Sequence, residues 1–180
     1  MMTYIAILRG INVSGKNIIK MAELKTAFTH AGFQKTTTYI QSGNIIFQAA
    51  EQNVSVLASE ISGLILAHFK LIVPVIVLTV DMLQSIIDQN PFVAQPGRDT
   101  GSLHITFLDG PAGDYTADKI EKKKQVEEHY VIGSNAVYLD IPKYGNSKLT
   151  NNLFETVLRV TATTRNWKTA NEILSIASQL

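Results

Sequence analysis

The sequence has no cysteine, and it has only one tryptophan among its 180 residues. The absence of cysteine excludes disulfide bonds, thiolate nucleophiles and thiolate metal ligands. The sequence also lacks a long apolar run. Its most apolar stretch, 71–80, has about half of the roughly 20 residues that a membrane helix needs, and it contains Pro74. This stretch is typical of a buried strand.

The first residues, Met1-Met2-Thr3-Tyr4, lack the basic start and the apolar run of a secretory signal. We therefore expect a cytoplasmic protein that does not associate with membranes. Hydrophobic residues make up 46% of the sequence and charged residues 17%, which is ordinary for a folded protein and not typical of disorder. A chain of 180 residues can bury one sizeable core or two small ones.

The net charge is only +1, but the charges are unevenly distributed. Residues 1–48 hold five basic residues and one acidic residue, whereas residues 49–141 hold six basic and twelve acidic residues. The last segment, 142–180, is basic again, with five basic and two acidic residues. Solvated faces scatter charge in this way by chance, but two basic ends would also form a surface for an anionic partner.

Hydrophobic periodicity predicts the same order of elements twice. In the first half we expect strands at 4–8, 36–40, 45–48 and 71–80, with helices at 20–31 and 54–69. A linking helix at 82–89 and a loop at 90–101 follow. In the second half we expect strands at 103–108, 129–132, 136–141 and 160–164, helices at 117–124 and 148–158, and a terminal helix at 167–179. Each half therefore has the order βαββαβ.

This order is typical of the ferredoxin-like fold, an antiparallel sheet with strand order 4-1-3-2. We predict an α+β protein of two tandem ferredoxin-like units, 1–80 and 102–180, with a linking helix in 81–101 and a C-terminal helix. The two halves could still form one compact domain. Local matches support a duplication: 5–10 resembles 105–110, and Tyr39 precedes Asn44 as Tyr130 precedes Asn135.

The predicted topology groups polar residues in two places, because certain strand ends share one edge of each sheet. In the first unit, the loop 9–17 and the turn 41–44 should be neighbours, which groups Arg9, Asn12, Lys16, Asn17, Gln41, Ser42 and Asn44. In the second unit, the exits of the third and fourth strands group Ser147, Lys148, Arg165 and Asn166. These residues are the candidate ligand-binding residues.

The segment Gly10-Ile11-Asn12-Val13-Ser14-Gly15-Lys16-Asn17 is one residue away from the phosphate-loop pattern G-x-x-x-x-G-K-[ST]. The departure is at Asn17, where the pattern has the hydroxyl that binds magnesium. Phosphate loops also belong to parallel sheets, with a helix that starts at the lysine, whereas the helical pattern here starts later. Three interpretations stay open: a nucleotide-hydrolysing loop, a looser anion cradle that includes Arg9, and a structural turn.

Several motifs carry a resemblance to a known family. They are Arg9-Gly10-Ile11-Asn12-Val13, Gly15-Lys16-Asn17, Thr38-Tyr39-Ile40-Gln41-Ser42-Gly43-Asn44, Ser147-Lys148-Leu149 and Thr164-Arg165-Asn166-Trp167. Together they resemble the bacterial DUF1697 family, and the match runs from the first strand to the last helix. The function of this family is unknown, so the resemblance implies no activity. Ser14 stands where the family often has a second glycine.

Motifs for catalysis are weak. The histidines lie far apart in the sequence, at His30, His68, His104 and His129, so we expect no metal site and no cofactor. Ser147-Lys148 could be a serine with a lysine base, but Asn146 or Ser147 fits better as the N-cap of a helix that begins at Lys148. Trp167 either stacks on a ligand ring or anchors the core.

Three functional hypotheses follow. The first is a protein that binds an anionic ligand, either a nucleotide-like metabolite or a nucleic acid backbone, through the basic loops; the near-neutral charge and the lack of an aromatic ladder disfavour nucleic acid. The second is a metal-independent enzyme that acts on a phosphorylated or carboxylated metabolite oriented by Asn12, Lys16, Gln41, Ser42 and Asn44. The third is a structural or interaction module whose loops lock the two halves together. It predicts that Arg9 and Lys16 are buried in salt bridges or hydrogen bonds to the other half, with no open cleft beside them. The sequence does not indicate an oligomeric state.

Overall fold

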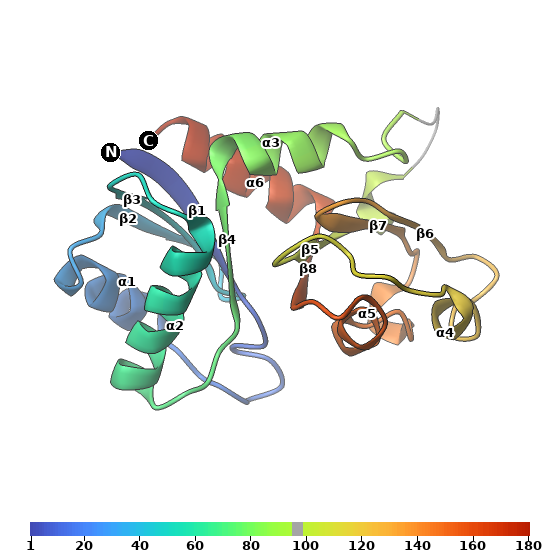
Figure 1. Cartoon of the computed structure of the whole chain (residues 1–180), viewed down its shortest axis with the longest axis horizontal. Helices are drawn as coiled ribbons and strands as arrows, with labels where there is room; N and C mark the ends of the chain where they lie inside the picture. Colours follow the sequence, from blue (N-terminus) through green and yellow to red (C-terminus); the bar gives the residue numbers. More distant parts are fainter. Residues whose placement is uncertain (95–98) are drawn as a thin grey trace. The chain divides into compact units, whose positions relative to one another are not determined.

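The fold is α+β, with two tandem ferredoxin-like βαββαβ units (Figure 1). A computed structural model describes residues 1–94 and 99–180, so part of the predicted loop 90–101 lies outside the described residues. The first unit contains β1 (Met2–Leu8), α1 (Met21–His30), β2 (Gln34–Tyr39), β3 (Asn44–Ala49), α2 (Val54–Phe69) and β4 (Val75–Thr79). The linking helix α3 (Val80–Asp88) follows.

The second unit repeats the order, after a 3₁₀ helix at Thr100–Ser102. It contains β5 (Leu103–Leu108), α4 (Asp118–Glu121), β6 (His129–Ile132), β7 (Ala136–Asp140), a 3₁₀ helix at Tyr144–Asn146, α5 (Asn151–Leu158) and β8 (Ala162–Asn166). The helix α6 (Trp167–Ser178) ends the chain. The sheet orders are β2-β3-β1-β4 and β6-β7-β5-β8, all antiparallel, which confirms the predicted order in both units.

In the first unit, α1 and α2 cover one face of the sheet (Figure 1). Tyr4, Ala6 and Leu8 alternate along β1 onto this face, as the period of a strand requires, and all three are fully buried. Phe47 of β3 stacks on Tyr4 and meets Phe28 of α1 edge-on. This aromatic cluster forms the centre of the core.

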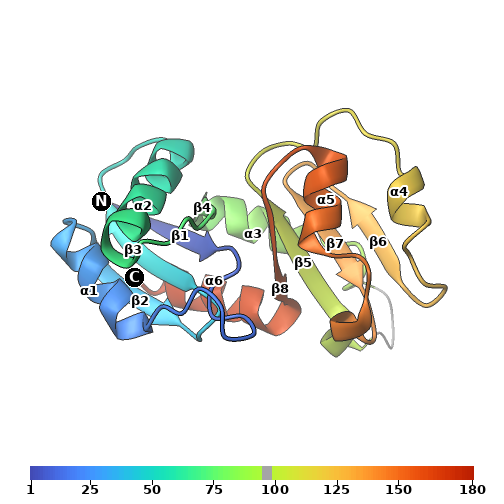
Figure 2. The ribbon, with the colours of Figure 1, turned by 90° about the horizontal axis from the view of Figure 1, so that it is seen from below.

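In the second unit, α4 and α5 cover one face of the sheet (Figure 2). Val137 and Leu139 of β7 pack there with Phe154 and Leu158 of α5. A regular core therefore sits between sheet and helices in each unit.

The compact units are 1–84 with 172–180, and 85–171. This division differs from the one expected from the sequence, because the boundaries fall inside α3 and α6 and the last nine residues join the first unit. Two side chains of the first unit hold this end of the chain. Lys35 Nζ and Gln48 Nε2 both donate to the main-chain oxygen of Leu180, at 3.2 and 2.9 Å.

Three predicted elements differ from the structure by three or more residues at one end. The strand expected at 71–80 is shorter, since β4 begins only after Pro74, which cannot donate a ladder hydrogen bond. The helix expected at 117–124 is reduced to α4. The helix expected at 148–158 begins at Asn151, with Thr150 as its N-cap, so the prediction that Asn146 or Ser147 caps it is wrong.

Backbone hydrogen bonds confirm that the second unit repeats the first. The N–H of Leu8 donates to Gly43, and that of Leu108 donates to Asn135. Likewise the N–H of Arg9 donates to the carbonyl of Pro74, and that of Asp109 donates to the carbonyl of Thr161. Pro74 and Thr161 each lie directly before the fourth strand of their unit. The structural counterpart of Asn135 is therefore Gly43, so the predicted match of Asn135 with Asn44 is wrong by one position.

Candidate functional site

The connection between β1 and α1 contains a small β-hairpin. Val13 and Lys16 form an antiparallel bridge, and the N–H of Lys16 donates to the carbonyl of Val13 at 2.9 Å. The two residues between them, Ser14 and Gly15, both have positive φ, as in the type I′ turns that suit two-residue hairpins. Because α1 begins only at Met21, the lysine does not start a helix as it would in a phosphate loop.

Asn12 holds the base of this hairpin. Its side-chain amide donates to the carbonyls of Ile19 and Gln41, at 2.9 and 2.8 Å, and its side-chain oxygen accepts from the N–H of Ile19 at 2.8 Å. Both amide hydrogens are thus used within the protein. The bond to Gln41 places the loop 9–17 beside the turn 41–44, as predicted.

The other two asparagines also stabilise local backbone. Asn17 donates to the carbonyl of Gly10 at 3.0 Å. Asn44 is fully buried, and its amide donates to the carbonyl of Tyr39 and the hydroxyl of Ser42, both at 3.0 Å. These bonds do not favour the enzyme hypothesis, because they use the amide groups of Asn12 and Asn44 that were expected to polarise a substrate.

The hairpin presents its own side chains to solvent. All residues from 13 to 18 are exposed, including Lys16 and the apolar Val13 and Ile18. Arg9 is half-buried at the base of the loop, and Gln41 is exposed in the neighbouring turn. Within the part of the chain that the structure describes, the side chain of Lys16 makes no hydrogen bond or ion pair.

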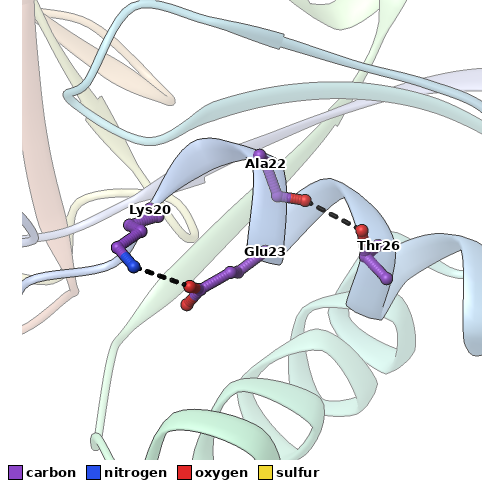
Figure 3. Close-up of polar contacts among 4 residues, drawn as sticks. All are labelled: Lys20, Ala22, Glu23 and Thr26. Carbon is purple, nitrogen blue, oxygen red and sulfur yellow. Dashed lines mark hydrogen bonds and ion pairs between the residues drawn. The ribbon is translucent and has the colours of Figure 1, made fainter.

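Lys20 lies at the other end of the loop and differs from Lys16. Its ammonium group forms an exposed ion pair with Glu23, one turn along α1, at 3.1 Å (Figure 3). In the same helix the hydroxyl of Thr26 donates to the carbonyl of Ala22. The positive charge of Lys20 is thus partly balanced, so Lys16 is a better candidate than Lys20 to bind an anion.

In the second unit, Tyr144 and Thr164 share a side-chain hydrogen bond, so the exits of the third and fourth strands lie side by side as predicted. Several candidate residues there have local roles. Ser147 accepts from the N–H of Leu149, and Asn166 accepts from the N–H of Thr169, as an N-cap of α6 does. Lys148 is exposed. Trp167, the first residue of α6, is partly buried.

Arg165 is buried and bound by its neighbours. Its guanidinium donates to the hydroxyl of Thr163 and the carbonyl of Thr164, at 3.1 and 2.9 Å. Burial lowers the pKa of Arg165 to about 10, against an opposing effect of Tyr144. Burial also raises the pKa of Tyr144. Its hydrogen bond with Thr164 and the charge of Arg165 oppose this rise.

A chain of polar side chains connects Tyr144 and Thr164 to neighbouring residues. The ring of Tyr144 stacks on His104 with centroids 4.2 Å apart, and burial lowers the pKa of His104 although its hydrogen bond to Ser102 opposes this. Thr164 shares a hydrogen bond with Thr106 at 2.7 Å and donates to Asn151 at 2.6 Å. The cluster is well satisfied, so it stabilises the edge of the sheet.

Sequence reasoning missed a pocket in the second unit, formed by the connection between β5 and α4 and the end of α5. No motif marks these residues. The internal repeat was the available signal, because this connection is the counterpart of the loop 9–20. Among the described residues, no group of three or more metal-binding side chains is close enough to hold an ion, and no helix is long and apolar enough to cross a membrane.

Fold and loop together define an α+β protein of two tandem ferredoxin-like units. A family model described as a protein of unknown function, DUF1697, matches residues 1–138, so the chain belongs to the DUF1697 family. Among solved structures, the conserved bacterial protein SP0830 from Streptococcus pneumoniae is similar, with a TM-score of 0.70 and 24% identity over 98% of both chains. This likeness shows the fold alone. No curated protein matches the chain.

Proposed function

We propose that the protein binds phosphate groups of an anionic ligand through the hairpin of the first unit, with Lys16 and Arg9 as the cations. The backbone of this loop carries the proposal. Positive φ occurs at Gly10, Asn12, Ser14, Gly15 and Asn17. Three of these residues are not glycine. A positive φ at such residues costs free energy, and strained conformations of this kind cluster at functional sites.

The contacts of Asn12 and Asn17 explain how this strained conformation persists. They bind the loop to itself and to the neighbouring turn, so that Lys16 stands next to the two-residue turn of a rigid hairpin. A rigid loop loses little conformational entropy when a ligand binds. The exposure of Lys16 also disfavours the purely structural hypothesis, which requires this side chain to be buried.

The shape of the loop supports an extended ligand. Six consecutive exposed residues, 13–18, form a projecting hairpin, which contacts a chain-like anion better than it encloses a small molecule. A nucleic acid backbone fits this description, and a nucleotide-like metabolite is the alternative source of the same phosphate chemistry. With two cations and no aromatic ladder, we expect weak binding without sequence preference, with a Kd on the order of 10⁻⁴ M.

The test is a titration of a labelled single-stranded RNA and, in parallel, of ATP, at several salt concentrations. We expect RNA binding that weakens with salt, with a slope in log K against log[salt] that falls by about 0.7 in Lys16→Ala. Lys25→Ala is the matched control, since it removes the same charge from an exposed position of α1. ATP binding without RNA binding would favour the metabolite. Equal losses in Lys16→Ala and Lys25→Ala, or no binding of either ligand, would contradict the proposal.

A further inference from the structure

The pocket in the second unit has the size of a site for a small metabolite. Its volume is about 320 Å³, at the lower end of the range of about 300–1,000 Å³ for small-molecule sites. The lining residues are Asp114, Tyr115, Thr116, Lys119, Thr156, Val157 and Arg159. All of them belong to the second unit, and none belongs to the hairpin proposed above.

Contacts within the unit hold the wall of this pocket in place. The N–H of Gly113 donates to the carbonyl of Leu158 at 3.1 Å, and a Cβ at position 113 would lie only 3.3 Å from that oxygen. The N–H of Thr161 donates to the carboxylate of Asp109 at 2.9 Å. The pocket is therefore formed without a ligand, as most small-molecule sites are.

Two cations line the pocket without balancing partners. Within residues 1–94 and 99–180, the side chains of Lys119 and Arg159 make no hydrogen bond or ion pair. The carbonyls at the end of α5 would repel an anion, but those of Glu155 and Leu158 already accept from the N–H groups of Arg159 and Gly113. The charge in the pocket is thus available to a ligand.

Arg159 also has an unusual backbone that its counterpart in the first unit helps to interpret. Both Arg159 and Lys70 end a helix in the left-handed conformation, with φ of 59° and 58°, where glycine or asparagine is favoured. The ammonium group of Lys70 donates to the carbonyl of Ala67 in its own helix at 2.9 Å. The side chain of Arg159 has no such bond, and Arg159 lines the pocket.

We propose that this pocket binds a small phosphorylated polyol or sugar. The phosphate lies against Lys119 and Arg159, whose guanidinium can bind two of its oxygens. Asp114 repels a bare anion but accepts hydrogen bonds from hydroxyl groups, and Thr116 and Thr156 offer further polar contacts. Tyr115 and Val157 contact the carbon skeleton. This inference does not rest on the function proposed for the hairpin.

The experiment is calorimetric titration of the full chain with glycerol 3-phosphate, inorganic phosphate and glycerol. We expect glycerol 3-phosphate to bind more tightly than either of the other two. Lys119→Gln and Arg159→Asn should each weaken it at least tenfold, because each removes a charged hydrogen bond. Arg159→Asn should also raise the melting temperature, since asparagine tolerates the left-handed conformation, so that lost binding cannot be ascribed to unfolding.

Lys70→Asn is the matched control, because it makes the same exchange at the equivalent position of the first unit. It should leave the affinity unchanged. Loss of binding in Lys70→Asn, no binding of glycerol 3-phosphate, or equal affinity for inorganic phosphate would overturn the inference. Weakening by Lys16→Ala and not by Arg159→Asn would overturn it too, while supporting the hairpin. Failure of RNA to bind would affect only the proposal for the hairpin.

Discussion

The two units have the same backbone topology but different side chains on the sheet face that their helices cover. Tyr4 and Ala6 of β1 lie in an aromatic and aliphatic core, whereas their counterparts in β5 are His104 and Thr106. The polar pair belongs to the network of Tyr144 and Thr164. One topology thus tolerates both an apolar core and a satisfied polar cluster, because the sheet and helices set the frame in each case.

The loops after the first strand differ even more. In the first unit the loop from Arg9 to Lys20 contains a hairpin with a run of positive φ, whereas no residue of the fully described segment 109–117 has positive φ. The charge directly after the first strand also changes sign, from Arg9 in the first unit to Asp109 in the second. Two repeats can keep the same hydrogen-bonded frame and differ in one loop. One scaffold then carries two different surfaces for binding. Exchanging residues between the repeats tests this difference.

The largest effect is expected for Gly43→Asn, which gives the first unit the residue found at position 135. Gly43 has φ of 80°, and an added Cβ would lie 2.7 Å from Cδ1 of Ile11 and 2.8 Å from Cβ of Leu8. Clash and strain together should lower the free energy of unfolding by about 3 kcal/mol or more, measured by urea denaturation. The reverse exchange, Asn135→Gly, should cost only about 0.5–1 kcal/mol. Similar losses for both would show that the turns are equivalent.

A smaller loss is expected for Asn12→Ala, which gives the loop the residue found at position 112. It removes three hydrogen bonds and leaves alanine at a φ of 53°, so the free energy of unfolding should fall by about 2–3 kcal/mol. Asn12→Gly is the control, because glycine adopts this φ freely and should be about 1 kcal/mol more stable than alanine. A loss below about 1 kcal/mol in Asn12→Ala would show that these bonds do not hold the hairpin.

The smallest effect concerns pH and His104. Because burial lowers its pKa in the folded state, the unfolded state takes up a proton first as the pH falls below the usual value of 6.5. Stability should therefore decrease with falling pH, with a slope well under the limit of about 1.4 kcal/mol per pH unit because the ring is partly exposed. Denaturation of wild type and His104→Gln between about pH 7.5 and 5.5 measures this slope. An unchanged slope in the variant would exclude His104 as the cause.

The order and pairing of the helices and strands could be predicted from the sequence, because they depend on the periodicity of apolar residues. α2, β5 and β6 have the predicted bounds, and the pairing of strands follows from the βαββαβ order. The adjacency of the loop 9–17 and the turn 41–44 follows from that order as well. Local alternation of apolar residues is enough to predict such features.

The interior of the candidate sites could not be predicted in this way. The hairpin at Val13–Lys16 has no apolar alternation, and the bonds of Asn12 join residues that only the fold brings together. Likewise, nothing in the sequence around Arg159 indicates a left-handed residue, since glycine and asparagine are absent there. Side-chain bonds to distant backbone decide these details, and short-range patterns do not contain them.

In the proposed function, Lys16 on the hairpin of the first unit binds phosphate groups. Two-dimensional NMR spectra of the isotope-labelled full chain, recorded during a titration with single-stranded RNA, show which residues the RNA contacts. We expect shifts concentrated in residues 9–18 and 40–43 that disappear in Lys16→Ala and persist in Lys25→Ala. Shifts confined to residues 85–171, or a pattern unchanged by Lys16→Ala, would contradict binding at the hairpin.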